Sequence, residues 1–255
     1  MDYVRWAARY DIFYEAAPEG ELEFYLNAID RHRGPVLELG VGTGRIAIPA
    51  AVMGYDVTGI DLNRPMLDRA RLKSAAAPLA GKLQLIEGDM SKINLSQKEF
   101  DLVIIPAHTL ALLTDEHVQS ETLMRCAEHM AANGTLIFNL FNPSEDLING
   151  DPSETFLLGI VEDDEIGIRH VLTGINDFDN ERQINRCTQT IETLDRHGQL
   201  IDREELQVLF RYLHNDQVIA MLEKAGLQAL EVFGDFDGSP LSEDSEEMIY
   251  VCQLR

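Results

Sequence analysis

The sequence is poor in basic residues: 21 Lys and Arg stand against 44 Asp and Glu among 255 residues, a formal net charge of −23. A protein that grips nucleic acid needs a basic surface that displaces counterions from the phosphates, and no run of Lys or Arg supplies one. We therefore expect no nucleic-acid partner. The charge favours a cationic substrate, although the same acidity would also serve solubility or adaptation to high salt.

Long apolar runs and cysteines are scarce as well. No apolar segment approaches the roughly 20 residues that cross a bilayer, and the N-terminal MDYVRWAARYD lacks the basic start and apolar stretch of a secretory signal. We expect no membrane association. Cys126, Cys187 and Cys252 are few, odd in number and far apart, which excludes a disulfide framework and fits a reducing, cytoplasmic setting. The apolar share of 45% is nevertheless ordinary for a globular core.

Strand-like and helical segments alternate over the first half of the chain. A helical pattern over residues 1–33 comes first, and Asn63 and Thr114 are expected to cap two later helices. Short apolar runs predict strands at 36–39, 56–61, 83–87, 100–105 and 136–141. This alternation predicts right-handed βαβ units and an α/β fold with a doubly wound, mostly parallel sheet.

The pattern changes after Pro143. Three segments rich in β-branched and apolar residues, separated by turn-forming residues, predict an inserted antiparallel meander at 166–175, 182–194 and 199–210. A helix capped near Asn215 and strands at 227–233 and 248–254 would complete a seven-stranded sheet. We expect a Rossmann-like core made of 1–150 and 211–255, with an N-terminal helical lid, and an inserted β cover over 151–210.

The strongest motif is the run VLELGVGTGR that ends at Arg45. A buried strand leads into three alternate glycines, Gly40, Gly42 and Gly44, and then into a helix. Glycine lets the backbone approach a ligand closely and adopt dihedrals barred to other residues, and the helix N-terminus presents free N–H groups. The turn therefore predicts a site for the polar part of a nucleotide-like cofactor.

Two kinds of cofactor fit this turn. Gly42, Gly44 and Ala47 match the G-x-G-x-x-A form of the dinucleotide fingerprint, and Asp61 lies about 20 residues on, as that interpretation requires. A dinucleotide fingerprint, however, starts directly after its strand. Here Glu38 stands two residues before the first glycine, where a carboxylate would repel a pyrophosphate and suit an ammonium or sulfonium charge.

Five motifs in register resemble those of class I S-adenosylmethionine-dependent methyltransferases, small-molecule type. They are Glu38-x-Gly40-x-Gly42-x-Gly44, the strand ending at Asp61-Leu62, the segment Glu87-Gly88-Asp89-Met90, the strand 100–105 with Pro106, and 123–141 with Ala132-Asn133-Gly134. The resemblance spans about residues 10–145 and resumes over 211–254. The resemblance implies that Asp61 accepts hydrogen bonds from the ribose hydroxyls and that Asp89 accepts one from the adenine amino group.

The resemblance thus implies a set of residues that bind S-adenosylmethionine. The set is Glu38, Gly40, Gly42, Gly44, Asp61, Leu62, Asp89, Met90, Pro106 and Tyr14. Related enzymes often cover the cofactor with an N-terminal Tyr-Asp-x-x-Tyr segment, here Tyr10 to Tyr14. Other roles stay open for some of these acids, because Asp61 would also cap a helix, Asp89 would also form a turn, and Glu38 would also stiffen the glycine loop.

Residues beyond the fourth and fifth strands are candidates for contact with the acceptor. His108 follows the fourth strand, at the edge of the sheet where chemistry occurs in this architecture. We treat it as the candidate catalytic base, and the equal alternative is that His108 is an ordinary surface residue. Tyr10, Asn139 and Arg211 are candidate substrate-binding residues. Asn142, like Asn139, lies near the end of the fifth predicted strand. The acidic residues between 235 and 247 are interpreted as a solvated loop.

We expect no metal site, since Cys126 and His129 share a helix face but no second pair completes a tetrahedral set. The predicted function is transfer of a methyl group from S-adenosylmethionine to a small molecule, with a slight preference for an amine nitrogen over a hydroxyl. The alternatives are a nicotinamide-dependent oxidoreductase and a protein that binds S-adenosylmethionine without turning it over. The oligomeric state stays open, with a homodimer among the states allowed.

Overall fold

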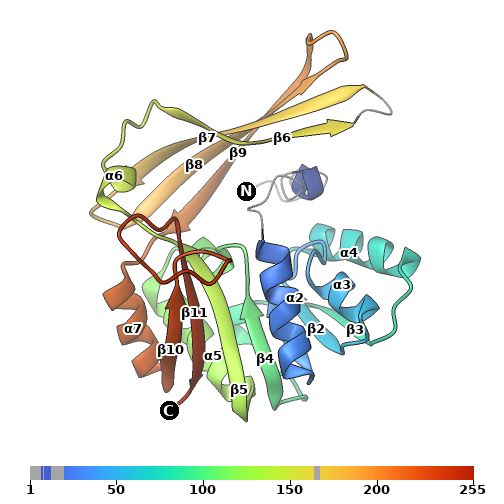
Figure 1. Ribbon diagram of the computed structural model, residues 1–255, viewed down its shortest axis with the longest axis vertical. Coiled ribbons are helices and arrows are strands. Elements are labelled where there is room, and N and C mark those ends of the chain that lie inside the picture. The colour runs from blue at the N-terminus through green and yellow to red at the C-terminus, as the bar shows by residue number, and fades with distance from the viewer. Residues whose placement is uncertain (1–6, 8, 13–19, 164–166) are drawn as a thin grey trace. The chain divides into compact units, whose positions relative to one another are not determined.

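The computed structural model describes residues 7, 9–12, 20–163 and 167–255. They divide into two compact units, whose sheets are both visible in Figure 1. The larger unit comprises Glu19–Ser144 and Tyr212–Arg255. The smaller unit comprises Glu145–Arg211 together with the described residues of the N-terminal segment.

A seven-stranded sheet in the order β10-β11-β5-β4-β1-β2-β3 forms the centre of the larger unit (Figure 1). Its strands are β1 (Val36–Leu39), β2 (Val57–Asp61), β3 (Leu83–Glu87), β4 (Phe100–Ile105), β5 (Met130–Phe141), β10 (Leu227–Phe233) and β11 (Glu247–Leu254). Only β11 runs against its neighbours β5 and β10. The predicted mostly parallel, Rossmann-like sheet is confirmed.

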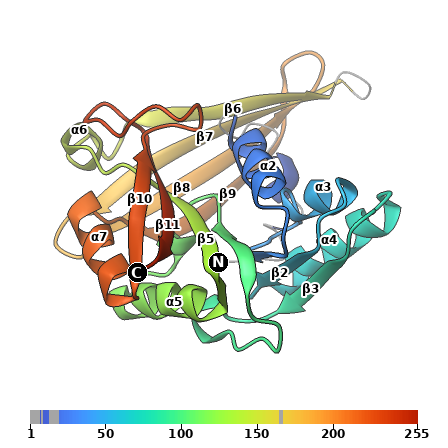
Figure 2. The same ribbon diagram turned by 60° about the horizontal axis from the view of Figure 1, so that its bottom comes forward.

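Helices complete the larger unit. One group, α2 (Glu21–His32), α3 (Ala47–Val52) and α4 (Arg64–Ala76), shares a single apolar cluster with the sheet, and Figure 2 shows these helices side by side. The helices α5 (Glu116–His129) and α7 (Asn215–Lys224) contact each other. Short 3-10 helices follow β3 at η1 (Met90–Lys92) and β4 at η2 (Thr109–Leu112). Among the described residues no helix is long and apolar enough to cross a membrane.

The central strands of this sheet, β1 and β4 among them, are covered on both faces. Side chains alternate along a strand, so Val36 points into the cluster shared with α2 while Leu37 points to the opposite face, and both are fully buried. This double burial explains why the strands read as continuous apolar runs rather than as alternating ones.

The sheet reverses its direction of growth between β1 and β4. From β1 the chain builds outward through β2 and β3, whereas from β4 it builds the other way, to β5. In open α/β sheets, ligands bind outside the carboxyl ends of the strands at such a point. The residues that follow β1, β2 and β4 therefore occupy the part of the sheet where a ligand is expected.

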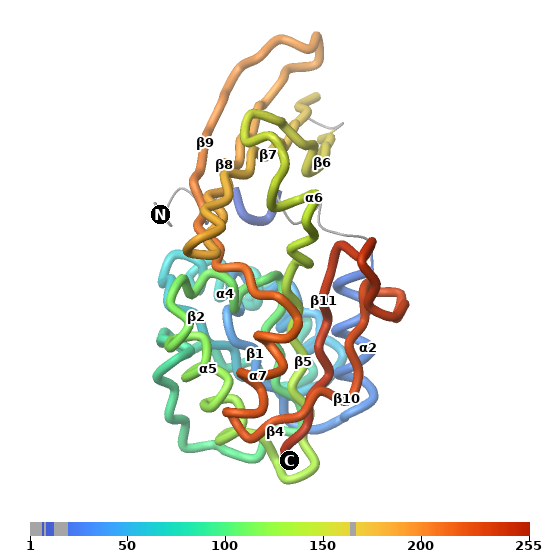
Figure 3. The backbone as a smooth tube through the Cα atoms, turned by 90° about the vertical axis from the view of Figure 1, so that its left-hand side faces the viewer, coloured from blue at the N-terminus to red at the C-terminus, as the bar shows by residue number. Residues whose placement is uncertain are grey.

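The smaller unit is a four-stranded antiparallel sheet in the order β6-β7-β8-β9, which can be followed along the tube in Figure 3. The helix α6 (Glu145–Ile148) precedes β6 (Thr155–Asp163), β7 (Ile168–Asp179), β8 (Ile184–Leu194) and β9 (Leu200–Arg211). Arg9 is hydrogen-bonded to Glu204 and Asp202 on β9, which ties the N-terminal segment to this sheet. The antiparallel sheet is confirmed, whereas its role as a cover stays a prediction.

Two helix caps differ from their predictions, and in the first case α7 begins after His214 rather than after Asn215. The helix α5 begins after Asp115, not Thr114, because the Asp115 carboxylate accepts from the N–H group of His117 at 2.8 Å. Asn63 caps α4 as predicted, and its side chain accepts from the N–H group of Met66. Adjacent residues that can both cap a helix are distinguished by backbone geometry, which the sequence does not show.

Candidate functional site

The glycine loop follows β1 with three left-handed residues: φ is +75° at Gly40, +53° at Gly42 and +83° at Gly44. Two of these glycines are also required by close packing. A Cβ atom on Gly40 would lie 2.3 Å from Cγ2 of Thr109, and one on Gly44 would lie 2.8 Å from Cδ1 of Ile48. The loop therefore runs against the residues after β4 and against α3, with no room for a side chain at either glycine.

Asp61, at the end of β2, holds this loop in place. Its carboxylate accepts from the N–H group of Gly42 at 2.8 Å and from that of Asn63 at 2.7 Å. Burial raises the pKa of Asp61, and the two N–H groups partly offset that rise. Each carboxylate oxygen retains a second acceptor position, so the arrangement still fits the predicted contact with two ribose hydroxyls.

Glu38 is a buried carboxyl group on β1, and its side chain is almost fully enclosed. The N–H group of Ala47 is hydrogen-bonded to it, but Oε2 has no hydrogen-bond partner among the described residues. Burial first, and then the charges of Asp61 and Glu21, raise the pKa of Glu38 to about 8, although Arg45 opposes the change. A buried oxygen without a partner at the carboxyl end of β1 fits an ammonium group of a bound ligand.

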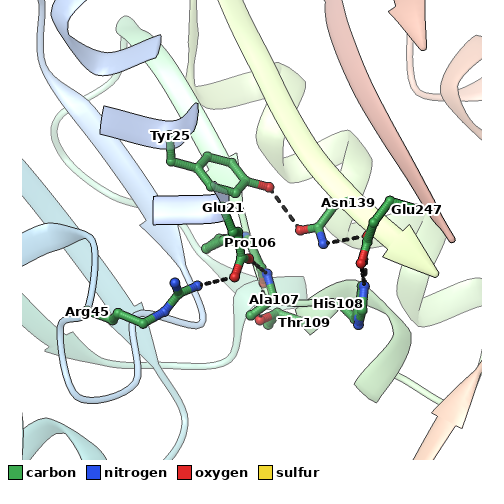
Figure 4. Close-up of polar contacts among 9 residues, drawn as sticks. All are labelled: Glu21, Tyr25, Arg45, Pro106, Ala107, His108, Thr109, Asn139 and Glu247. Carbon is green, nitrogen blue, oxygen red and sulfur yellow. Dashed lines mark hydrogen bonds and ion pairs between the residues drawn. The ribbon is translucent and has the colours of Figure 1, made fainter. Parts of the chain in front are cut away.

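Glu21, at the start of α2, joins the glycine loop to the residues after β4, and sequence reasoning missed it. Its buried carboxylate accepts from Nη2 of Arg45 at 2.7 Å and from the N–H group of Ala107 at 3.1 Å. Figure 4 shows the two contacts on opposite sides of the carboxylate. The helix α2 thus positions both loops that lie at the carboxyl edge of the sheet.

His108 lies in a conformationally unusual turn after β4. Ala107 and His108 both have left-handed backbones, with φ of +58° and +55°, a conformation that residues other than glycine seldom adopt and that gathers at functional sites. Nε2 of His108 lies 2.9 Å from both carboxylate oxygens of Glu247. The ring is 27% exposed, so it reaches the surface of the larger unit without being a free surface residue.

Asn139 on β5 is the second acceptor-side candidate that the structure brings into this cluster. Its Nδ2 donates to Oε2 of Glu247 at 3.0 Å, and its Oδ1 accepts from the hydroxyl of Tyr25 at 2.9 Å. Figure 4 shows the resulting chain from α2 to His108. Tyr25 was not a candidate, because nothing in its helical pattern distinguishes it from a core aromatic residue.

Glu247 corrects the interpretation of the acidic residues between 235 and 247 as a solvated loop. It is the first residue of β11, it pairs with Phe141 on β5, and it is 8% exposed. Its carboxylate therefore faces the cluster of His108 and Asn139 rather than water. The preceding Glu246 is exposed, as the prediction required.

The structure gives the adenine-side candidates unequal support. Leu62, directly after β2, is 70% exposed, while Met90 is half-buried and Pro106 buried. Asp89 caps η1 and accepts from Ser91. A hydrogen bond from Lys92, with those from Ser91, lowers the pKa of Asp89. The turn-forming role is thus present, and the adenine contact stays a prediction.

Four further candidates belong to other parts of the chain. Tyr14 lies outside the described residues. Tyr10, half-buried, and Arg211, buried, belong to the smaller unit, where their substrate contact stays a prediction. Asn142 is hydrogen-bonded through Nδ2 to the carbonyl of Ser245, which is a structural role.

The pair Cys126 and His129 forms no metal site. The ring of His129 accepts from the N–H group of Leu95 and is hydrogen-bonded to the carbonyl of Arg125, so both ring nitrogens are used structurally. Within the described ranges no group of His, Cys, Asp and Glu has the arrangement of a metal site.

Comparison with known proteins relates this chain to methyltransferases. Residues 36–134 match the family model of a methyltransferase domain. The protein named "Putative methyltransferase YqeM" of Bacillus subtilis is 26% identical over 255 residues, which cover 99% of this chain and 97% of that protein. The cypemycin N-terminal methyltransferase of a Streptomyces species is 26% identical over 230 residues, which cover 86% and 82%.

The fold has close solved counterparts as well. The structure of the CcbJ methyltransferase from Streptomyces caelestis superposes with a TM-score of 0.80 at 24% identity, covering 94% of this chain and 98% of that one. The match to this domain model, the relatives and the fold together support a class I S-adenosylmethionine-dependent methyltransferase with S-adenosylmethionine as its cofactor. The comparisons thus favour S-adenosylmethionine over the dinucleotide that the glycine loop also allowed.

We predict that Asp61→Ala weakens binding of S-adenosylhomocysteine by tens-fold, a loss on the order of 2–3 kcal/mol or more. The variant loses the contacts to the ribose and also the acceptor that holds the N–H groups of Gly42 and Asn63. Titration calorimetry measures the dissociation constant, with Asp68→Ala on the exposed face of α4 as the control. A dissociation constant for Asp61→Ala equal to that of the wild type would refute the assignment.

We predict that Glu38→Gln stabilises the protein increasingly as the pH rises from about 4.5 to about 8, and by a constant amount above that. The raised pKa means that the folded chain keeps a proton that the unfolded chain releases in this window, so wild-type stability declines there, whereas glutamine does not titrate. Affinity for S-adenosylhomocysteine should fall by about tenfold or more, since a charged acceptor is lost.

Differential scanning calorimetry at a series of pH values compares Tm of Glu38→Gln with that of the wild type. The control is Glu87→Gln, which changes an exposed carboxylate at the end of β3 and should show no such pH dependence. A difference in Tm between Glu38→Gln and the wild type that does not vary with pH would contradict the buried, protonated state of Glu38.

Proposed function

We propose that the enzyme methylates a small-molecule acceptor and prefers an amine nitrogen to a hydroxyl oxygen. The observation that carries this proposal is the pair formed by His108 and Glu247 at the carboxyl edge of the sheet, with 2.9 Å between Nε2 and each carboxylate oxygen. An amine arrives protonated and must lose a proton before it attacks, and an imidazole supported by a carboxylate can take that proton.

The electrostatics of the edge also favour an amine. Glu21, Glu38, Asp61 and Glu247 all lie at the carboxyl ends of the strands or beside them, and Arg45 is paired with Glu21. A cationic acceptor is attracted to such a surface, and the net charge of −23 acts in the same direction. The same field opposes a phosphorylated acceptor or a nucleic acid.

A relative supports the same acceptor chemistry. The cypemycin N-terminal methyltransferase is, by its name, an enzyme that methylates an N-terminus, and its resemblance to this chain extends over most of both proteins. We extend the amine preference to this chain as part of the proposal. The three cysteines are all free and buried thiols, which fits the proposed cytoplasmic setting.

The residues of the edge would divide the work between binding and proton transfer. S-adenosylmethionine supplies a methyl group on a sulfonium centre. Glu38, the glycine loop and Asp61 would hold this cofactor. The Glu21 carboxylate, through Arg45 and the N–H group of Ala107, fixes the position of the glycine loop relative to the turn after β4. His108 would accept the proton of the acceptor. Holding the nucleophile in line with the methyl group supplies much of the rest of the rate enhancement.

We predict that labelled methyl groups from S-adenosylmethionine appear in amines when matched panels of amines, phenols, carboxylates and a transfer RNA pool are offered. With the amine so found, His108→Ala should lower kcat by about 100-fold or more, because the proton acceptor is lost, and leave affinity for S-adenosylhomocysteine within about twofold, because His108 is no part of the proposed cofactor-binding set.

Label chiefly in the RNA or in phosphorylated compounds would refute the charge argument, and label chiefly in phenols would refute the amine preference. No label in any panel, with S-adenosylhomocysteine still bound, would favour the alternative of a binding protein without turnover. Full activity of His108→Ala on the amine would remove His108 from the mechanism.

A further inference from the structure

The three hydrogen bonds that connect Tyr25 to His108 have a defined direction. A carboxylate only accepts, so Glu247 requires a donor from each neighbour that it contacts. Asn139 must therefore turn its Nδ2 toward Glu247, where it lies 3.0 Å from Oε2. With Nδ2 so placed, Oδ1 of Asn139 faces Tyr25, and the Tyr25 hydroxyl must donate to it at 2.9 Å.

The same reasoning fixes the tautomer of His108. Nε2 faces both oxygens of Glu247 at 2.9 Å, so the hydrogen of the neutral ring is on Nε2, and the lone pair is on Nδ1. No described residue is hydrogen-bonded to Nδ1. The nitrogen that can accept a proton is therefore the one that Glu247 does not contact.

Among the described residues, the charged groups that act on the ring come from two elements. Glu247 lies on β11, and Glu21 lies at the start of α2, where Arg45 is paired with it. On β5 the neighbour is uncharged, since the ring of Phe141 stands edge-on with its centroid 6.0 Å from that of His108. Burial lowers the pKa of His108, but the charge and hydrogen bond of Glu247, with the charge of Glu21, raise it overall.

Tyr25 and Asn139 make the carboxylate of Glu247 a stable acceptor. Burial, with the charges of Glu21 and Glu247, holds the pKa of Tyr25 well above its usual value, so the hydroxyl keeps its proton and the direction of the chain does not reverse. All three residues behind the imidazole, Tyr25, Asn139 and Glu247, are buried. The ring is thus supported from the interior, while the His108 side chain stays 27% exposed.

We propose that Glu247 is a positioning residue, which fixes the ring and the tautomer of His108 so that Nδ1 takes the proton of the acceptor. The inference rests on the proposed function. In the step itself, the N–H bond of the acceptor ammonium breaks, its proton forms a bond to Nδ1, and the electron pair stays on the acceptor nitrogen as the lone pair that attacks. His108 becomes the imidazolium, which the carboxylate of Glu247 stabilises.

Titration of the His108 ring by NMR tests this without any acceptor. The His108 signal is assigned by its loss in His108→Ala, and long-range proton–nitrogen spectra report the tautomer. We expect hydrogen on Nε2 in the neutral wild-type ring. In Glu247→Gln the ring should titrate at lower pH, since the charge that favours imidazolium is gone. Glu246→Gln, the neighbouring exposed glutamate, is the matched control and should titrate like the wild type.

Turnover of the amine found in the panel assay gives the second readout. Glu247→Gln should lower kcat by about tenfold or more and move the acid limb of its pH profile to lower pH, with affinity for S-adenosylhomocysteine within about twofold of wild type. Glu247→Asp keeps the charge on a shorter side chain, and we expect it to restore part of both effects. It also serves as the test if Glu247→Gln is too unstable to measure.

The outcomes separate this inference from the proposed function. Hydrogen on Nδ1, an unchanged titration in Glu247→Gln, or an unchanged pH profile overturns the role of Glu247, even where amines are methylated and His108→Ala is inactive. Absence of amine methylation, or full activity of His108→Ala, overturns the proposed function whatever the NMR titration shows. A changed titration together with a changed profile supports the inference.

Discussion

The carboxylate of Asp61 accepts hydrogen bonds from the backbone N–H groups of Gly42 and Asn63, and the rest of the site depends on this interaction. It joins the glycine loop after β1 to the end of β2, two neighbouring parallel strands. The loop then has its three left-handed glycines in place, and Arg45, directly after them, can reach Glu21 at the start of α2. One half-buried acid thus sets the geometry of the loop and, through it, of the helix beside it.

Buried acids at the carboxyl edge carry an energetic cost that explains the local chemistry. Glu38 keeps an unpartnered oxygen and a pKa near 8, so its ionised form is unfavourable until a cation is near. Glu247 is satisfied by donors from Asn139 and His108. The first acid therefore suits a bound cationic group, whereas the second supports a base, and the two lie on strands on opposite sides of the switch point between β1 and β4.

Much of the fold was predictable, because short apolar runs bounded by turn residues mark buried parallel strands. Predicted and observed bounds coincide at 36–39, 83–87, 100–105 and 227–233. The strand β6 was missed, since its ladder shifts register between Leu157 and Gly159 and Leu157 is 62% exposed, so the alternation is broken. Glu247 was missed for another reason. Only its pairing opposite Phe141 takes it out of an acidic run that otherwise resembles a solvated loop.

The central claim is that the carboxyl edge of the large sheet holds S-adenosylmethionine, and thermal unfolding with added ligand tests it most directly. A ligand that binds only the folded protein stabilises it by about 2.7 kcal/mol at a concentration 100 times its dissociation constant. S-adenosylhomocysteine should raise Tm of the wild type and, at the same concentration, raise that of Asp61→Ala by much less, and NAD should leave both unchanged. An increase in Tm with NAD, or none with S-adenosylhomocysteine, would contradict the account.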